Sequence, residues 1–199
     1  MKKILSPFKR VQLRISILIL FFYLLAISCH KKPVEDPLHP TNYPSPTYIG
    51  ADKIVCRIDG EYFETSSNGS RIMGTYPIEV SYDTSTQRFQ INGFDKGEIK
   101  SGVSRQISIK VSGVKNITTY DLMPRFNYYS SRFNSASISN NTSEVFETDS
   151  LYNGNVRITK LDVNIQKRII CGTFSFKALN KKTNRITVVS DGWFDLVYY

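Results

Sequence analysis

Beyond residue 50, short runs of alternating apolar and polar residues follow one another, separated by polar turns. This period of two is typical of β-strands that bury one face and expose the other. The runs cover residues 54–58, 78–82, 89–91, 107–111, 120–122, 126–128, 136–138, 156–158, 161–165, 170–176, 186–188 and 194–198. No stretch of ten or more residues there has helical periodicity. The pattern predicts an all-β domain, an antiparallel β-sandwich or closed barrel of about ten strands, because a second sheet or closure hides the sheet edges.

The first run is predicted to form a hairpin with the residues that follow it. An Asp-Gly pair at 59–60 favours a type I′ turn, in which both central residues have positive φ. A two-residue loop would place Ile58 opposite Glu61 and Cys56 opposite Phe63. Cys56 is therefore expected to face the core.

The N-terminal residues have the layout of a secretory signal peptide. Residues 1–14 are basic without acidic residues, residues 15–27 are almost wholly apolar, and the small Ser28 precedes Cys29. The apolar run fits the 7–15 residues of a signal peptide and is shorter than the ~20 that a membrane-spanning helix needs. We expect cleavage after Ser28. The other interpretations are an uncleaved anchor helix and secretion with a free thiol.

The residues leading to Cys29, Leu25-Ala26-Ile27-Ser28, resemble the lipobox of bacterial lipoproteins, in which the cysteine after the cleavage point is lipidated. The third residue before the cysteine, usually Leu in that family, is Ala26 here. The resemblance implies that Cys29 carries several acyl chains and is held in a membrane, because one chain alone binds only marginally.

A proline-rich tether is predicted to follow the anchor. Five of the chain's eight prolines lie within residues 29–50, where aliphatic residues are few, as in a semi-extended spacer that does not pack. The predicted organisation is a lipoprotein signal peptide over residues 1–28, the lipidated cysteine and tether over 29–50, and the β-domain over 51–199. Two lysines precede the first acidic residues after the anchor, which leaves the periplasmic and surface faces of the outer membrane equally open.

The charge balance argues against a polyanionic partner. The formal net charge is +9, but five of the 26 basic residues precede the apolar run, which leaves 21 basic against 17 acidic residues after it. So modest an excess does not favour nucleic acid. Neither His30 nor His39 lies in the β-region, so a Ser-His-Asp triad, a Cys-His pair or a His-ligated zinc site cannot form within it. No cofactor or metal is predicted.

Glu147 and Asp149 are the candidates for acid–base chemistry. They are two residues apart, so a strand would place both carboxylates on one face, roughly 6–7 Å apart at the backbone. Paired carboxylates serve glycoside hydrolysis or calcium binding. The favoured alternative is a solvated strand edge, because no second acidic cluster accompanies them.

Aromatic residues crowd residues 120–133, where Tyr128 and Tyr129 are possible ligand contacts and Arg125 and Arg132 lie among them. Aromatic rings beside hydrogen-bonding groups suit a sugar ligand. Tyrosine also favours strands, so plain packing explains the same residues.

Alternation also predicts the direction of two other side chains. Trp193, the only tryptophan, alternates with Phe194 and is expected on the exposed face, where it could contact a sugar. Cys171 alternates with Phe174 and is expected to point outward, whereas Cys56 points inward. An oxidising compartment permits a disulfide between these cysteines, but their opposite directions favour two separate thiols.

Four segments together resemble a family of small β-rich lipoproteins of the Bacteroidota that is known only as a domain of unknown function. The segments are IVCRIDGEYF, VRITKLD, CGTFSFKAL and SDGWFDL, and the resemblance covers roughly residues 53–197. It implies a fold and a cell-envelope location. It implies no catalytic residue.

These observations favour a non-enzymatic cell-envelope lipoprotein, held at the outer membrane by lipidated Cys29, that binds a protein or glycan partner or has a structural role. The alternative is a lipocalin-like carrier of a small apolar ligand in the mouth of a barrel. A third hypothesis is a carboxylate-dependent glycan hydrolase that uses Glu147 and Asp149.

Overall fold

The computed structural model describes residues 43–65, 77–95, 104–124, 134–140, 143–163 and 168–198, all within the compact unit Pro37–Tyr199. These residues form β-strands and no helix, so none of them forms a helix that could cross a membrane. The strands are β1 Lys53–Ile58, β2 Glu61–Glu64, β3 Ile78–Asp83, β4 Arg88–Phe94, β5 Arg105–Val111, β6 Thr119–Asp121, β7 Ser135–Asn140, β8 Val145–Glu147, β9 Gly154–Leu161, β10 Ile169–Asn180 and β11 Arg185–Val197.

All the strands join one antiparallel sheet around the long hairpin of β10 and β11. The order of the sheet is β2-β1-β11-β10-β8-β7-β5-β4-β3. The other edge of β10 is shared, because β9 pairs with its first half and β8 pairs near its end, while β6 pairs with β9.

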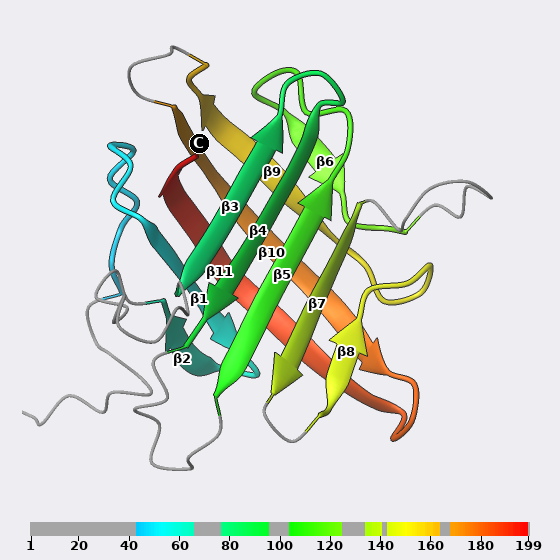
Figure 1. Cartoon of the computed structure of the whole chain (residues 1–199). Coiled ribbons are helices and arrows are strands. Elements are labelled where there is room, and N and C mark those ends of the chain that lie inside the picture. The colour runs from blue at the N-terminus through cyan, green and yellow to red at the C-terminus, as the bar shows by residue number, and fades with distance from the viewer. Residues whose placement is uncertain are drawn as a thin grey trace, which may run out of the picture. The chain divides into compact units, whose positions relative to one another are not determined.

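The sheet curls over on itself into a half-barrel, so that β3, β4, β5 and β7 cross over the layer that contains β1, β9, β10 and β11 (Figure 1). Curling buries the apolar face of most strands between the layers, whereas the apolar residues of β3 and β6 are partly buried against the core. The prediction of an all-β antiparallel fold of about ten strands, sandwich-like or barrel-like, is confirmed.

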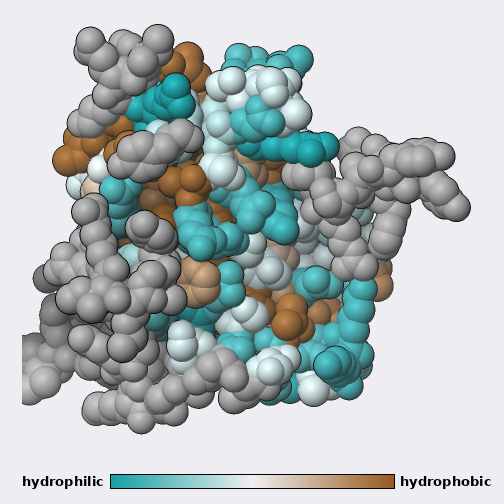
Figure 2. Space-filling model, in the orientation of Figure 1, coloured by the Kyte–Doolittle hydropathy of each residue, from teal (hydrophilic) through white to brown (hydrophobic). Residues whose placement is uncertain are grey.

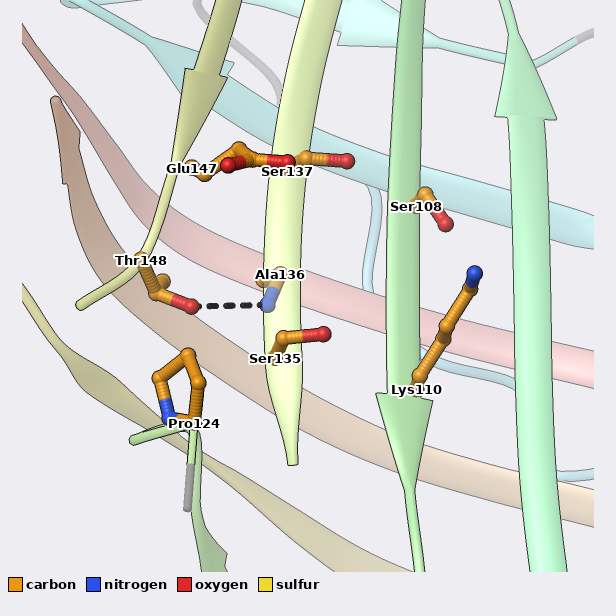
Figure 3. A pocket seen from close by; sticks show the side chains of 8 residues that line it. All are labelled: Ser108, Lys110, Pro124, Ser135, Ala136, Ser137, Glu147 and Thr148. Carbon is orange, nitrogen blue, oxygen red and sulfur yellow. Dashed lines mark hydrogen bonds between the residues drawn. The ribbon is translucent and has the colours of Figure 1, made fainter. Parts of the chain in front are cut away.

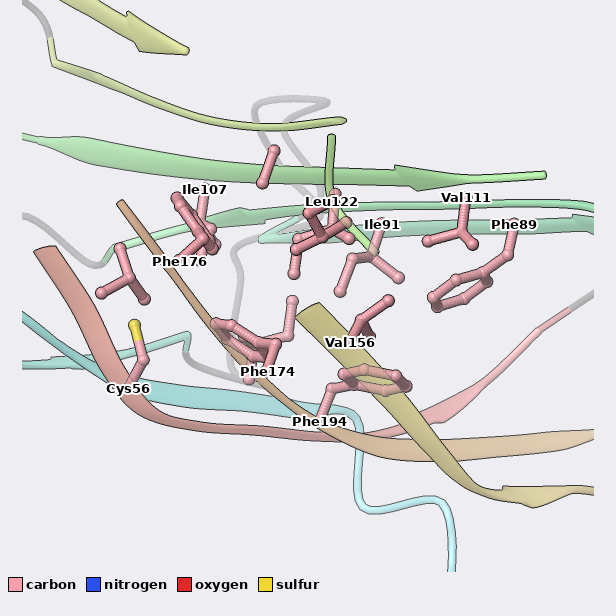
Figure 4. Packing of buried hydrophobic residues seen from close by; sticks show 14 of the residues in the cluster. Cys56, Phe89, Ile91, Ile107, Val111, Leu122, Val156, Phe174, Phe176 and Phe194 are labelled. Carbon is pink, nitrogen blue, oxygen red and sulfur yellow. The ribbon is translucent and has the colours of Figure 1, made fainter. Parts of the chain in front are cut away.

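The core lies between the two layers (Figure 4). Phe194 of β11 is its centre: the ring is fully buried, with its centroid 5.5 Å from the ring of Phe89 on β4 and 6.3 Å from that of Phe174 on β10. Aromatic pairs at such separations stabilise a core beyond the area they bury. Phe194 therefore joins the two layers of the sheet.

The first hairpin has the predicted register. Cys56 pairs with Phe63 and Ile58 with Glu61, and Cys56 is fully buried in the core. The turn residue Asp59 has φ 53°, as a type I′ turn requires.

The second Asp-Gly pair lies inside a strand. The sequence predicts two short runs near the C-terminus, but β11 is continuous and contains a β-bulge at Asp191, which has φ 53°. The register of the neighbouring β10 shifts between Phe174 and Phe176 at the same level. Gly192 is needed there because a Cβ atom would lie 2.4 Å from the Phe174 ring. The same dipeptide thus makes a turn in one place and a bulge in another.

One corner of the curl is fastened by Arg105 at the start of β5, which is 8% exposed. Its guanidinium donates to Glu61 Oε2 at 3.1 Å and to the Tyr62 carbonyl at 3.0 Å, both on β2, and lies 3.5 Å from Asp95 Oδ2 after β4. Thr65 and Asp95 form a β-bridge beside it. Strands β2 and β4 lie near opposite ends of the sheet order, so these contacts link the two ends.

Candidate functional site

Residues 43–50, which we call the strap, lie against the outer surface of β11. The Tyr43 hydroxyl donates to the Asp191 carbonyl at 2.5 Å, and Trp193 Nε1 donates to the Pro44 carbonyl at 2.9 Å. The structure therefore corrects the prediction that the whole tether is unpacked. Proline removes a donor but keeps its carbonyl, so a proline-rich segment can still be held by side chains of a sheet.

The strap is fastened at one carboxylate, that of the fully buried Asp195 on β11. Asp195 Oδ2 accepts from the Thr47 hydroxyl and from the Ile49 amide at 3.1 Å, and Oδ1 accepts from the Gly50 amide at 2.7 Å and from Cys171 Sγ at 3.1 Å. Burial alone would raise the pKa of Asp195, but these hydrogen bonds outweigh it and hold the pKa below its usual value. Asp195 is thus an ionised acceptor for three residues of the strap.

The register of the strands places Asp195 in an outward-facing row with Lys160 of β9, Cys171 of β10 and Lys53 of β1. Lys160 Nζ donates to the Tyr48 carbonyl of the strap at 2.9 Å. Cys171 is fully buried, and burial with its hydrogen bond to Asp195 raises its pKa to about 12, so it remains a protonated donor.

Cys56 and Cys171 are both free, on opposite faces of the sheet. The prediction of two separate thiols is confirmed. Cys171 points away from the core as predicted, but it is buried, because the row that it shares with Asp195 lies beneath the strap.

Beside the strap lies an open groove of about 530 Å³. One wall is the start of the strap, and the floor is the outer face of β9, β10 and β11. The groove is lined by Tyr43, Pro44, Ser45, Pro46, Asn155, Thr173, Phe174, Ser175, Ser190, Asp191, Gly192 and Trp193. The lining therefore combines aromatic rings with hydroxyl and amide groups, which is the usual composition of a small-ligand site.

Trp193 lies on the outer face, as alternation predicts, opposite Thr173. The expectation that its ring is exposed is wrong, however, because Trp193 is only 4% exposed and its indole nitrogen is bound to the strap. Only the part of Trp193 that lines the groove is available there. Its contact with a ligand stays a prediction.

The more accessible ring of the groove is that of Tyr43. It meets Tyr62 edge-on at 6.0 Å, and the Arg57 guanidinium lies 5.2 Å from its centroid. Burial raises the pKa of the Tyr43 phenol above its usual value, so the hydroxyl remains a donor. Arg57 also lies 3.7 Å from the carboxylate of Asp191, which offsets the negative charge at the groove.

A second hollow, of about 260 Å³, lies on the outer face of β5, β7 and β8 (Figure 3). It is lined by Ser108, Lys110, Pro124, Ser135, Ala136, Ser137, Glu147 and Thr148. The Thr148 hydroxyl accepts from the Ala136 amide at 3.0 Å.

The side of the domain seen in Figure 2 shows hydrophilic and neutral residues interspersed with smaller hydrophobic patches.

The predicted carboxylate pair divides between two environments. Glu147 lies on β8 opposite Ser137 and lines the second hollow. Asp149 Oδ1 accepts from the amides of Leu151 and Tyr152, at 2.8 and 2.7 Å, and so caps a turn. The hydrolase hypothesis stays a prediction, as does the apolar carrier.

The other predicted site residues, Cys29, Tyr128 and Tyr129, lie outside the described residues. Within the described ranges, no group of three or more His, Cys, Asp and Glu side chains is placed to hold a metal ion.

Sequence reasoning missed the strap and Asp195. A signal for Asp195 was present, since it is the one charged residue among the apolar residues 193–197. A buried acid in such a run needs several donors, and these donors come from the strap, far away in the sequence.

The fold and groove place the chain in the class of all-β antiparallel half-barrels with a polar, aromatic-lined surface groove. The chain belongs to the family described as "Domain of unknown function (DUF6252)", whose model matches residues 79–197. The match runs from β3 to the end of β11, so it contains Trp193 and Asp195 but not the strap. No curated protein and no solved structure matches the chain.

Proposed function

We propose that this protein is a lipid-anchored lipoprotein of the Bacteroidota cell envelope, at the outer membrane, whose β-domain is a non-enzymatic module that binds neutral glycans. The observation that carries the glycan proposal is the lining of the groove beside the strap. Tyr43 offers apolar ring surface, to which Trp193 adds only its 4% exposed part, and Asn155, Thr173 and Ser175 offer donors and acceptors beside it. The leader and Cys29 support the envelope location.

The electrostatics of the groove favour an uncharged ligand. Its one acidic side chain, Asp191, lies beside Arg57 at 3.7 Å, and its lining contains no lysine or arginine among the described residues. A sugar presents hydroxyl groups to polar side chains and a carbon-bound face to aromatic rings. Because the floor is built from adjacent strands, its polar groups recur at the strand spacing of roughly 4.8 Å, which suits a chain of sugar units.

Removing polar groups from the floor of the groove is expected to weaken glycan binding. Asn155→Ala and Thr173→Val should each raise the Kd of the full-length chain for a neutral hexasaccharide about fivefold, because each loses a hydrogen bond of about 1 kcal/mol. Both residues are exposed, so the fold should be unaffected. The measurement is isothermal titration calorimetry with maltohexaose, cellohexaose and chitohexaose.

The matched control is Asn92→Ala on β4, in the other layer of the sheet, which should bind like the native chain. If the folded native chain binds none of the three sugars, or if the groove variants and the control weaken binding equally, the glycan proposal is wrong.

The anchor has its own test. Cys29→Ser should move the full-length chain from the membrane fraction to the soluble fraction and abolish metabolic labelling with an alkyne fatty acid, because the acyl chains would have no attachment point. Cys171→Ser is the control and should remain labelled, since its thiol is buried in the domain. Equal labelling of both variants would refute lipidation at Cys29.

A further inference from the structure

The strap is held in a conformation that needs external support. Within the strap, Tyr48 has φ 60° and Gly50 has φ 78°, and Asp52, just after it, has φ 52°. Left-handed backbone at residues other than glycine costs free energy and persists only where the surroundings compensate. At Gly50 a Cβ atom would also lie 2.6 Å from Val197 Cγ2. The strap therefore turns tightly against β11, with the compensating contacts at Asp195.

The same few residues that hold the strap also shape the groove. Tyr43 and Pro44 form a wall of the groove, and Trp193 both lines the groove and donates to the Pro44 carbonyl. The fastening at Asp195 lies two residues further along β11 from Trp193, on the same face. Releasing the strap would remove this wall and uncover the Trp193 ring.

We propose that Asp195 is a positioning residue that clasps the strap to β11, so that docking of the strap and binding of a glycan in the groove are thermodynamically linked. This inference rests on the proposed function for its ligand. A ligand that contacts both strap and floor binds only the clasped form, so it stabilises that form by mass action. By reciprocity, release of the strap weakens binding of the ligand by the same factor. The protein would then hold its N-terminal segment more firmly when the groove is occupied.

The clasp consists of the Asp195 carboxylate and the groups of Thr47, Ile49 and Gly50 that donate to it. The charged groups around it determine its response to pH. Cys171 of β10 donates to Asp195, Lys160 of β9 holds the Tyr48 carbonyl, and Lys53 of β1 binds Glu64 at 2.6 Å. The carboxyl of Asp195 has a lowered pKa in the folded protein, so the clasp is closed above the usual pKa of about 3.9 and opens only as pH falls through the lower pKa of the folded state. The clasp therefore stays closed at neutral pH, and the ligand is its regulator there.

Amide hydrogen exchange of the full-length chain tests the clasp without any ligand. The amides of Ile49 and Gly50 donate directly to Asp195. In Asp195→Asn, where an NH₂ group replaces one acceptor oxygen, both amides should exchange at least about tenfold faster than in the native chain, and the single Trp193 indole resonance should move toward its solvent-exposed position. Thr47→Val removes one donor from the exposed strap and should give the same change to a smaller degree.

The matched control is Asp191→Asn, the same chemical change four residues earlier on β11. Asp191 is exposed and binds the strap through its backbone carbonyl, so its variant should keep native exchange at Ile49 and Gly50. If Asp195→Asn fails to fold, Thr47→Val measures the same event. Native exchange at both amides in Thr47→Val would overturn the clasp.

The linkage is tested with whichever neutral hexasaccharide binds the native chain. Saturation with it should slow exchange of the Ile49 and Gly50 amides. Asp195→Asn should raise its Kd in proportion to the fraction of chains whose strap is released, and by no more than the factor by which saturation slows that exchange. Fully released amides with unchanged affinity, or exchange that saturation does not slow, would overturn the linkage. If no hexasaccharide binds while Asp195→Asn still frees the amides, the glycan function fails and the clasp stands.

Discussion

Replacing Phe194 by alanine is expected to lower the free energy of unfolding by about 3–5 kcal/mol, the largest effect of any substitution considered for this domain. The ring is fully buried and lies between Phe89 of one layer and Phe174 of the other. Its loss leaves a cavity on both sides, because Gly172 directly opposite has no side chain to fill it. Since small domains are stable by about 5–15 kcal/mol, the variant should be close to unfolding at 37 °C.

Urea denaturation followed by the fluorescence of Trp193 measures this loss. Val188→Ala is the control on the same strand, with a side chain that is 41% exposed, and should change stability by less than about 0.5 kcal/mol. Phe194→Leu, which keeps part of the volume, should lie between the two. A loss below about 1.5 kcal/mol for Phe194→Ala would show that the layers are not joined through this ring.

The alternation of apolar residues predicted most strands, because successive residues of a strand point to opposite faces and only one face of a half-barrel is buried. Cys56 pairs with Phe63 and enters the core, as the Asp-Gly turn alone required. The short strand β8 was missed, since Val145 and Phe146 are too few residues to establish a period. That β11 is one continuous strand was not predicted. An Asp-Gly pair favours positive φ both in a hairpin turn, where the chain reverses, and in a β-bulge, where the strand continues.

The candidate site was less predictable, because it depends on contacts between distant parts of the chain. Alternation placed Trp193 and Cys171 on the outer face correctly. The strap that buries them is far away in the sequence, however: Thr47, which contacts Asp195, is 148 residues from it. Proline content predicts a stiff backbone, but it does not predict whether the stiff segment packs against a sheet. Parity therefore gives the face of a side chain, while its exposure depends on what covers that face.

Replacing Arg105 by methionine is expected to destabilise the domain by about 3 kcal/mol, because it opens the corner where the ends of the sheet meet. Breaking a buried ion pair by removing one partner typically costs about 3–5 kcal/mol, and the lower end applies here since the side chain of Glu61 is half exposed. The guanidinium carbon lies 5.8 Å from the centroid of the Phe63 ring. Methionine keeps an apolar stem of similar length, so the loss reports the guanidinium rather than a cavity.

The measurement is again urea denaturation, with Lys53→Met as the control. Lys53 pairs with Glu64 at 2.6 Å, but both side chains are about a third exposed, so this pair should contribute less than about 1 kcal/mol. Arg105→Lys should be intermediate, because an ammonium cannot reach Glu61 and the Tyr62 carbonyl together as the planar guanidinium does. If Arg105→Met proves no less stable than Lys53→Met, the curl of the sheet is held by its apolar core alone and the corner contacts contribute nothing to it.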